Sequence, residues 1–387
     1  MTEHHSIIIV GAGLSGLYLA WRLQQDNHDV MLLESRNRTG GRILSDEYNG
    51  KSRFDMGPAW VWPHFQPRLQ QLLTRFGLKV FKQFTSGELL YEKSPSDIER
   101  YSQQSSHSQS YRIEGGSQNL IDALQSSIAA STIHLDTRVQ SIHQQGLRID
   151  AVRNGENHVY SADTIILALP PRIAQQYISF DPEHSNNIIE SWRAIPTWMS
   201  GHSKVVFVYA QPFWREQNLS GEVFSHHGPL AEIYDGSPAT EEYFALTSFV
   251  GLSAQQRMQL NQDELIAACM AQLLRLFGEQ SQQVLDIRIK DWSQDKNTAT
   301  AIDTTTPAHH PHYADDMPRV FWDNALILAG TEVAREHGGY LEGALESADE
   351  ALSLLNIYRC SRRKRGRIDL NLIAPMRLIM NNQLFRN

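Results

Sequence analysis

Short apolar runs separated by glycine-rich turns mark the start of the chain. Residues 7–10 (IIIV) form a β-branched run that leads into residues 11–16 (GAGLSG), and apolar side chains then recur at helical spacing over residues 14–25. A second apolar run, residues 30–33 (VMLL), ends at Glu34. This order predicts a buried strand, a tight turn and an amphipathic helix, followed by a second strand.

Apolar runs farther along the chain predict two kinds of sheet. Residues 164–169 are almost continuously apolar, which is typical of a strand in the central layer of an α/β domain. From Ser203 onward, short runs alternate with glycine-containing turns, which favours antiparallel pairing. One helix interrupts them, because residues 266–277 repeat at helical spacing and end before Gly278. The predicted strands span residues 132–139, 146–152, 163–169, 204–209, 222–225, 230–234, 243–250 and 284–289.

The glycines of residues 11–16 have the spacing of a dinucleotide-binding turn. Gly11 permits the turn, Gly13 lets the backbone approach a pyrophosphate, and Gly16 lets the helix pack on the strand. The N-terminus of that helix offers free N–H groups to a phosphate. Glu34 follows at about the spacing, ~20 residues, expected of an acid that binds ribose hydroxyls. A packing turn in an α/β domain is the alternative explanation.

A second glycine-rich block near the end of the chain supplies the other half of the pattern. Residues 326–329 (LILA) lead into residues 330–332 (GTE), and residues 338–344 (GGYLEGA) follow. Two separated halves indicate one long dinucleotide held by both ends of the chain, which favours FAD over NAD. Residues 40–42 (GGR) add a cation that can neutralise the pyrophosphate.

The length of 387 residues exceeds the usual size of a single core, so two domains are expected. The fold class is α/β, with a discontinuous Rossmann-type FAD-binding domain and a second, mixed sheet-and-helix substrate domain. We expect residues 1–64, 113–170 and 320–356 to form the FAD-binding domain. Residues 65–112 and 171–319 are expected to form the substrate domain. A basic C-terminal extension, residues 357–387, completes the chain.

The net charge of −8 argues against nucleic acid as a partner. Charge is uneven, however, because residues 357–387 carry eight arginines and lysines against Asp369 alone. This tail is a solvated extension, a subunit contact in a homo-oligomer, or a contact with an acidic membrane surface.

Neither membrane insertion nor secretion is expected. No apolar run approaches a membrane span, and the first residues lack a signal-peptide pattern, so we expect a cytoplasmic protein. Cys269 and Cys360 give no disulfide framework. Residues 309–312 (HHPH) lack firm metal-ligand spacing, so no metal site is expected.

Taken together, these residues resemble the flavin-containing amine oxidase family, which includes the monoamine oxidases. The resemblance covers roughly residues 6–355. The motifs that carry it, besides the glycine fingerprint, are residues 39–42 (TGGR), 55–60 (DMGPAW), 167–171 (LALPP), 203–206 (SKVV), 212–215 (PFWR) and the closing block 330–347.

The resemblance implies roles for individual residues. Lys204 would hold a water against flavin N5 and Tyr340 would form an aromatic wall beside the flavin, so these two are the expected catalytic residues. Glu332 would bind the ribityl–phosphate region, the backbone near Leu341 would face the pyrimidine edge, and the main chain of Val139 would meet the adenine. The residues expected to bind the cofactor are Gly11, Gly13, Ser15, Gly16, Glu34, Ser35, Gly41, Arg42, Gly57, Pro58, Ala59, Trp60, Val139, Trp292, Gly330, Thr331, Glu332, Gly339, Tyr340, Leu341 and Ala344.

Two positions depart from the family's pattern. When Trp292 is aligned with the family's tryptophan, Ala301 stands where a flavin-linking cysteine would stand, so FAD should be bound noncovalently. Ile302 replaces the second tyrosine of the monoamine oxidase aromatic pair. The substrate slot is then one-walled, or its other face comes from one of three tryptophans, Trp60, Trp62 and Trp322.

The resemblance predicts an FAD-dependent amine oxidase that acts on a small-molecule amine. Hydride would pass from the carbon next to nitrogen to the flavin, the imine would hydrolyse, and O2 would be reduced to hydrogen peroxide. An amino acid substrate is disfavoured, because Trp60 stands where related amino acid oxidases carry a carboxylate-binding arginine. Two alternatives stay open: a flavin desaturase or isomerase of a lipid-like substrate, and a non-catalytic FAD-binding redox protein.

Overall fold

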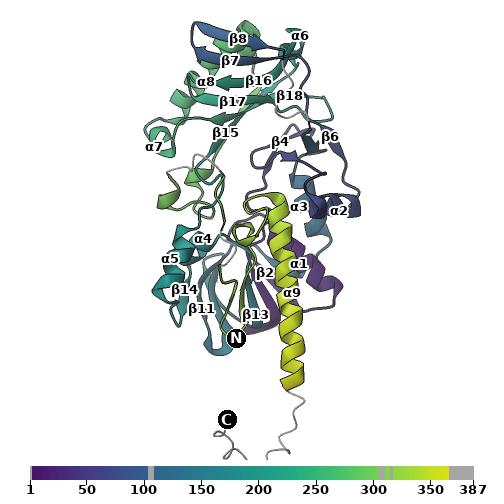
Figure 1. Ribbon diagram of the computed structural model, residues 1–387, viewed down its shortest axis with the longest axis vertical. Helices are drawn as coiled ribbons and strands as arrows, with labels where there is room; N and C mark the ends of the chain where they lie inside the picture. The colour runs from purple at the N-terminus through teal and green to yellow at the C-terminus, as the bar shows by residue number, and fades with distance from the viewer. Residues whose placement is uncertain (1, 103–108, 305–309, 314–316, 366–387) are drawn as a thin grey trace, which may run out of the picture.

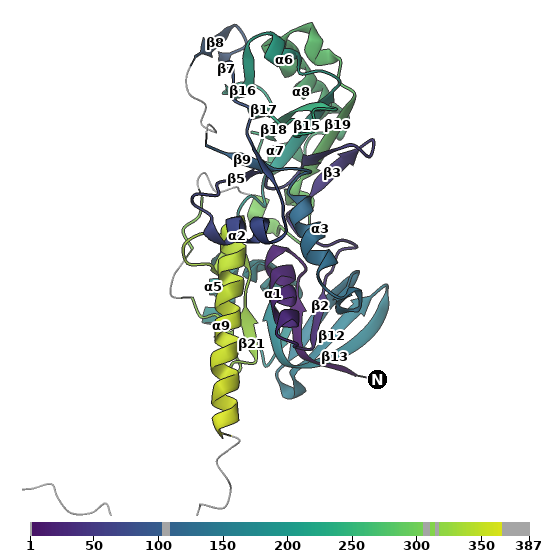
Figure 2. The ribbon, with the colours of Figure 1, turned by 90° about the vertical axis from the view of Figure 1, so that its right-hand side faces the viewer.

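Two large sheets dominate the molecule, whose computed structural model describes residues 2–102, 109–304, 310–313 and 317–365. A nine-stranded sheet lies in the lower half of Figure 1 and a seven-stranded sheet in the upper half. Figure 2 shows the long helix α9 (Leu341–Arg365) along the outside of the lower half. The fold is therefore mixed α/β, as the sequence predicts.

The nine-stranded sheet is built around four parallel strands. β1 (Glu3–Val10) lies between β2 (Val30–Leu33) and β13 (Glu156–Leu167), and β21 (Leu326–Leu328) pairs with the end of β13. The carboxyl ends of all four strands therefore meet at one edge of the sheet. The other strands of this sheet are β10 (Ile133–His134), β11 (Thr137–His143), β12 (Arg148–Arg153), β14 (Ser179–Asp181) and β20 (Val320–Phe321).

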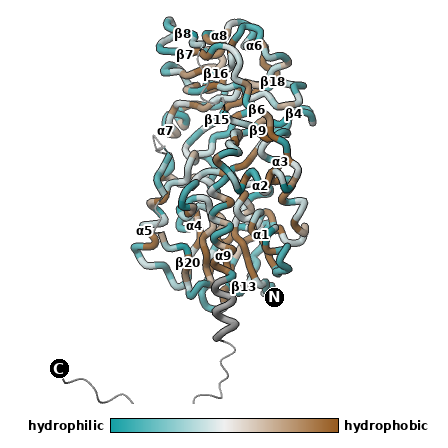
Figure 3. Tube along the Cα trace, turned by 45° about the vertical axis from the view of Figure 1, so that its right-hand side comes forward, coloured by the Kyte–Doolittle hydropathy of each residue, from teal (hydrophilic) through white to brown (hydrophobic). Residues whose placement is uncertain are grey.

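Both faces of this sheet are covered by apolar side chains. Ile7 and Ile9 of β1 join one core, and Ile8 and Val10 join the other, because successive strand residues face opposite sides. This explains why the strands have continuous apolar runs instead of alternating ones. Figure 3 shows the hydrophobic segments running through this part of the trace. The covering helices are α1 (Leu14–Gln25), α2 (Pro67–Arg75), α3 (Gln118–Ser126) and α9 over one face, and α4 (Pro171–Tyr177) and α5 (Asn186–Ala194) over the other.

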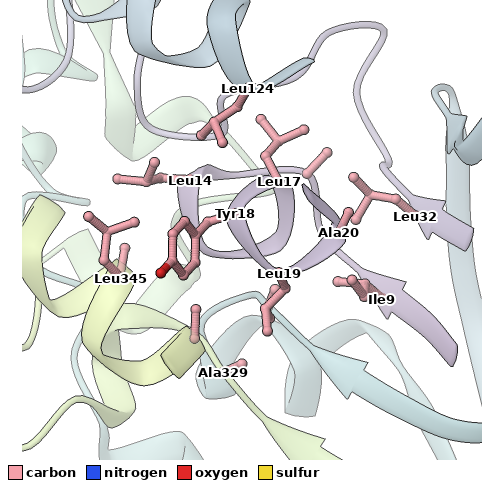
Figure 4. Close-up of a cluster of buried hydrophobic side chains, with 14 of the residues drawn as sticks. Ile9, Leu14, Leu17, Tyr18, Leu19, Ala20, Leu32, Leu124, Ala329 and Leu345 are labelled. Carbon is pink, nitrogen blue, oxygen red and sulfur yellow. The ribbon is translucent and has the colours of Figure 1, made fainter. Parts of the chain in front are cut away.

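Helix α1 is the element that the sequence defines most sharply. Leu17, Leu19 and Ala20 are fully buried, and Figure 4 shows them among side chains of β1, β2 and α9. Gly16 lies against the turn that precedes the helix, because a Cβ atom added there would lie 1.9 Å from the carbonyl oxygen of Gly11. Only a glycine at this position lets the helix begin so close to β1.

The seven-stranded sheet carries the middle of the chain. Its central strands are antiparallel, but β16 pairs with β7 in parallel. Helix α8 (Gln262–Phe277) packs against it through Leu265, Cys269 and Leu273. In spatial order the strands are β19 (Asp286–Asp291), β15 (Ser203–Tyr209), β18 (Phe244–Val250), β17 (Leu230–Asp235), β16 (Leu219–Ser225), β7 (Glu88–Ser94) and β8 (Asp97–Tyr101).

Two small sheets complete the strands. The hairpin of β3 (Ser45–Tyr48) and β4 (Ser52–Asp55) is one, and β5 (Trp60–Val61), β9 (Tyr111–Ile113) and β6 (Val80–Lys82) form the other. The short helices α6 and α7 span Phe213–Glu216 and Ala254–Arg257. Short 3-10 helices span Ala130–Thr132, Gln145–Leu147, Glu279–Gln282, Trp292–Gln294, Ala301–Thr304 and Thr331–Val333.

The predicted helix over residues 14–25 is confirmed, but one predicted strand is wrong. Residues 132–139 do not form a single strand, because Asp136 has a φ of 50° and turns the chain between β10 and β11. The sequence prediction also missed β7 and β8, whose charged residues obscure the apolar alternation. The predicted domain boundaries stay a prediction.

The basic extension falls largely outside the described residues. Helix α9 continues through Arg365, and the roles predicted for the tail in subunit or membrane contact stay predictions. Among the described residues, no helix combines the length and the apolar composition that crossing a membrane requires.

We predict that Gly16→Ala destabilises the protein by about 3 kcal/mol, the upper end of the usual cost of overpacking. The added methyl group would overlap the Gly11 carbonyl, whereas a Cβ atom at Gly13 would meet nothing within 4 Å. Urea unfolding of both variants in their flavin-free form measures the difference, with Gly13→Ala as the matched control. Equal stability of the two variants would contradict the packing role of Gly16.

Candidate functional site

A cavity of about 370 Å³ lies at the carboxyl edge of the four parallel strands and reaches the seven-stranded sheet. Its walls come from the segments that follow β1, β2, β13 and β21, and from side chains of β15 and β18. Ligands of open α/β sheets bind in such crevices. The volume is within the usual range for a small-molecule or cofactor site.

Most of the predicted site residues line this cavity. They are Gly11, Gly13, Ser15, Glu34, Gly41, Arg42, Gly57, Pro58, Ala59, Trp60, Lys204, Trp292, Gly330, Thr331, Glu332, Gly339, Tyr340, Leu341 and Ala344.

Three predicted residues do not line the cavity. Gly16 packs against Gly11, and the Ser35 hydroxyl lies 3.4 Å from the Glu34 carboxylate. The side chain of Val139 is buried in the core beneath β11. Only the backbone of Val139 could therefore take part in binding, which is the role that the resemblance implies.

The glycines of the first turn leave room for a ligand in front of α1. A Cβ atom at Gly13 would meet nothing within 4 Å, and Gly13 begins α1 without a side-chain cap. Gly41 approaches it so closely that a Cβ atom there would lie 3.2 Å from the Gly13 Cα. Free N–H groups at an open helix N-terminus suit a phosphate or pyrophosphate.

Glu34 ends β2 with its carboxylate buried at the cavity. One carboxylate oxygen accepts the backbone N–H of Ala12 at 2.8 Å, and the other accepts that of Arg36 at 2.9 Å. The Arg36 guanidinium lies 3.6 Å from Glu34 and donates to Asp295 at 2.8 Å. The acid is therefore fixed in place by the backbone around it.

The closing block places Glu332 opposite the first turn. Its carboxylate has no solvent exposure and forms an ion pair of 2.6 Å with Arg42. The Arg42 guanidinium contacts Oε1, whereas Oε2 has no hydrogen-bond donor among the described residues. A buried carboxylate oxygen that lacks a donor is costly, and a hydroxyl group of a bound ligand would supply one.

Glu346 holds the loop that leads back to the cavity. Its carboxylate accepts the backbone N–H groups of Arg335, Glu336 and His337 at 2.7–3.1 Å. These bonds hold the pKa of Glu346 below its usual range even though burial raises it. The sequence prediction gave this acid no role.

Lys204 lies in β15 and is 3% exposed. Its Nζ donates to the carbonyl oxygens of Gly57 at 2.6 Å and of Asp55 at 3.1 Å. The ammonium also lies 5.3 Å from the ring centre of Phe249 and 6.0 Å from that of Trp60. Burial lowers the pKa of Lys204 to about 8, so its amine loses its proton far more readily than a surface lysine.

Aromatic side chains form much of the remaining wall. Tyr340 lines the cavity, and the ring of His310 stacks against it with centroids 4.6 Å apart and an interplanar angle of 7°. The His310 ring is fixed by a 2.8 Å hydrogen bond to the Gly338 carbonyl and an edge contact with Trp198. His310 therefore covers one face of the Tyr340 ring, which stays 40% exposed.

The structure also corrects the choice of the second aromatic wall. Trp60 and Trp62 line the cavity, but Trp322 packs against Phe180 and His184 in the core on the far face of the nine-stranded sheet. Trp322 sits in a turn at positive φ, which the sequence alone did not indicate.

Several lining residues were missed by sequence analysis: Gln66, Trp198, Met199, His202 and Phe249. Two of them could have been found from the strand pattern. His202 is two residues before Lys204, and Phe249 is its cross-strand partner on β18. Such positions share one face of a sheet. Burial lowers the pKa of His202 to about 4, so its ring is neutral at physiological pH.

Within the described ranges, no cluster of three or more histidine, cysteine, aspartate or glutamate side chains is placed to hold a metal ion. His309, from the histidine cluster noted in the sequence, lies outside these residues.

The comparisons with known families agree with this geometry. The family described as flavin containing amine oxidoreductase matches residues 89–351, and a NAD(P)-binding Rossmann-like domain matches residues 9–76. Amine oxidase [flavin-containing] B of Mus musculus is 21% identical over 457 residues, covering 91% of this chain and 86% of its own length.

Solved structures of amine oxidases share the fold. Putrescine oxidase bound to putrescine matches with a TM-score of 0.77 and 21% identity, over 92% of this chain and all of the other. Cyclohexylamine oxidase from Brevibacterium oxydans IH-35A matches with a TM-score of 0.76 and 18% identity, over 93% of this chain and all of the other.

We predict that Gly13→Ala folds normally but loses flavin. The new methyl group would project into the open space that the glycine leaves in the cavity. The ratio of flavin absorbance to protein absorbance after purification measures occupancy, with the unfolding curve as control. A normally folded Gly13→Ala protein that keeps full flavin would contradict this placement of the cofactor.

We predict that Lys204→Met removes a pH dependence of stability. The folded protein binds fewer protons than the unfolded chain between pH 8 and 10.5, because the pKa of Lys204 is lowered to about 8. The unfolding free energy of the unchanged protein should therefore rise with pH across this window, by roughly 3 kcal/mol relative to Lys204→Met. Urea unfolding at several pH values measures it, and parallel curves for the two proteins would contradict the buried, charged lysine.

Proposed function

The chain belongs to the flavin-containing amine oxidoreductases, and on that premise we propose that it oxidises a small apolar amine with O2 as the electron acceptor. The amine carbon loses a hydride and the nitrogen a proton, giving an imine that water hydrolyses to a carbonyl compound and ammonia or a smaller amine. O2 takes up the two electrons and two protons and becomes hydrogen peroxide. When bound, the flavin supplies the hydride acceptor and the route for electrons to oxygen.

The residues present fit the dinucleotide that this family uses. The open space at Gly13 suits the pyrophosphate, and the Glu332 carboxylate oxygen that lacks a donor, Oε2, suits a hydroxyl group between phosphate and ring. We propose noncovalent attachment, because Ala301 offers no nucleophile and does not line the cavity.

The observation that carries the proposal is the buried ammonium of Lys204 at the cavity wall. Two of its three N–H donors are held by the carbonyls of Asp55 and Gly57, so one remains to hold a water or oxygen molecule in the cavity. Burial also keeps this cation among apolar groups, where its field is strong. An ordinary strand lysine would extend to solvent instead.

The charges along the cavity wall favour a monoamine. Among the described residues, the acids that line the cavity are Glu34 and Glu332, and both are engaged by arginines, Arg36 and Arg42. The region around Lys204 is instead lined by aromatic side chains and the neutral ring of His202. The part of the chain that the structure describes offers a second ammonium no carboxylate partner there, and offers a substrate carboxylate no free arginine.

The shape of the apolar cavity wall and contacts with its aromatic rings would therefore select the substrate. Trp60, Phe249 and Tyr340 present ring faces or edges, against which the hydrocarbon part of an amine can pack. Because aromatic and aliphatic walls solvate an ammonium poorly, binding would favour the neutral amine, the form from which hydride is lost most easily.

We predict that butylamine reduces the flavin and that putrescine, which differs by a second amino group, does so at least about 30-fold less efficiently. The factor corresponds to ~2 kcal/mol for burying an ammonium without a partner. Anaerobic mixing followed at the flavin absorbance band gives the reduction rates, and peroxide is then assayed after air is admitted. Larger apolar amines such as cyclohexylamine serve as the positive control.

Equal efficiency with both amines would contradict the monoamine assignment. A flavin that stays oxidised with every amine would contradict amine oxidation itself, and would leave carbon–carbon desaturation as the chemistry to test.

A further inference from the structure

Asp55 and Arg112 form a buried ion pair directly behind Lys204. The Asp55 Oδ2 atom lies 3.7 Å from an Arg112 guanidinium nitrogen, and the two side chains are 1% and 6% exposed. The same aspartate supplies, through its backbone, one of the two carbonyls that accept from Lys204. The chemistry proposed above gives this pair no role.

The Asp55 carboxylate fixes the segment on which Lys204 rests. Its Oδ1 atom accepts the Ser45 hydroxyl at 2.6 Å and the backbone N–H and hydroxyl of Ser117 at 2.8 Å and 2.9 Å. It therefore joins β3 and the start of α3 to the end of β4. These bonds fix the position of Asp55, whose own carbonyl accepts from Lys204.

Other contacts fix Met56, the residue between Asp55 and Gly57. Met56 donates its backbone N–H to Leu44 at 2.8 Å, and its carbonyl accepts the indole N–H of Trp292 at 3.0 Å. Three successive carbonyls, from Asp55 to Gly57, thus each accept a bond from the seven-stranded sheet or the segment that follows it.

Arg112 is held just as firmly. One guanidinium nitrogen donates to the Ser237 carbonyl at 2.9 Å, and the group lies 5.6 Å from the ring centre of Phe81. The cation therefore stays near Lys204 whether or not the lysine is charged.

The charged groups that face Lys204 act in opposite directions. The Asp55 carboxylate raises the pKa of Lys204, the Arg112 guanidinium lowers it, and burial lowers it most. The cross-strand neighbour on β19, Lys290, is paired with Asp295 at 3.1 Å. His202, directly before β15, is neutral at these pH values because burial lowers its pKa to about 4.

We propose that Asp55 and Arg112 are positioning residues for Lys204. Asp55 aims the ammonium at the cavity by fixing the segment that carries its two carbonyl acceptors, and the opposite charges of the pair set how strongly the buried ammonium is stabilised. The consequence for the rate rests on the proposed function, but the consequence for the charge of Lys204 does not.

The test compares Asp55→Asn with Arg112→Gln, using two measurements. The first is the thermal unfolding midpoint from pH 7 to 10.5, each variant being compared with its own Lys204→Met double variant. The second is the pH dependence of the reaction of the reduced protein with O2. The lysine-dependent transition is the pH at which the difference between each variant and its Lys204→Met double variant changes, because Lys204 loses its proton. Asp55→Asn removes the anion and should move this transition down by about one pH unit. Arg112→Gln removes the guanidinium and should move it up by a similar amount.

The matched control is Arg275→Gln, which leaves the buried Glu92 without its cation. Glu92 lies on β7 of the seven-stranded sheet, far from β15. It should lower the unfolding midpoint without moving the transition. Arg112→Lys keeps a cation and should restore most of the original position. This variant and Arg112→Gln suffice if Asp55→Asn does not fold.

The proposal is supported if Asp55→Asn and Arg112→Gln shift the pH of the transition in opposite directions and if both shifts vanish in the Lys204→Met background. Shifts of the same sign, or none, would overturn it, because a merely structural pair would lower stability without moving the transition. Failure of the proposed function is recognised separately, since amines would then leave the flavin of the unchanged protein oxidised while the unfolding measurement still reports on Lys204.

Discussion

The hydrogen bonds from Lys204 to the carbonyls of Asp55 and Gly57 are the interaction on which the site depends. They join the seven-stranded sheet to the segment after β4, at the point where the cavity lies between the two large sheets. A cation buried without carboxylate contact is costly, so the surrounding structure must hold it firmly. The indole of Trp292, bound to the carbonyl of Met56, strengthens the same junction.

The first glycine turn and the closing block of the sequence meet at the side of the cavity opposite Lys204. The turn after β1 and the loop after β21 come together because both strands flank β13, and the Arg42–Glu332 ion pair links the segments that follow. Glu346 fixes the closing loop by accepting the backbone N–H of Arg335, and Glu342 fixes the start of α2 by accepting that of Leu69. In the proposed function, the charged end of the cavity would hold the cofactor and the aromatic end the substrate, and this division underlies the proposed preference for a monoamine.

Local sequence patterns predict the parts of this structure that depend on local geometry. Residues 11–16 predict the turn and α1, because glycine spacing and helical repeat are short-range signals. The resemblance also leads to Lys204 and Tyr340, which the fold brings to one cavity. The position of Trp198 depends on a loop between distant elements, which no local pattern specifies, whereas His202 and Phe249 follow from the strand pattern around Lys204 once its register with β18 is known. Trp322 was one of three candidates for the second wall because an aromatic residue carries no sign of which core it joins.

A crystal structure of the protein loaded with flavin tests the central claim most directly. The account predicts that the flavin ring lies between Lys204 and Tyr340, with the ammonium linked to the ring through one ordered water and the pyrophosphate at the N-terminus of α1. A flavin ring bound elsewhere, or a Lys204 side chain turned away to solvent, would contradict it.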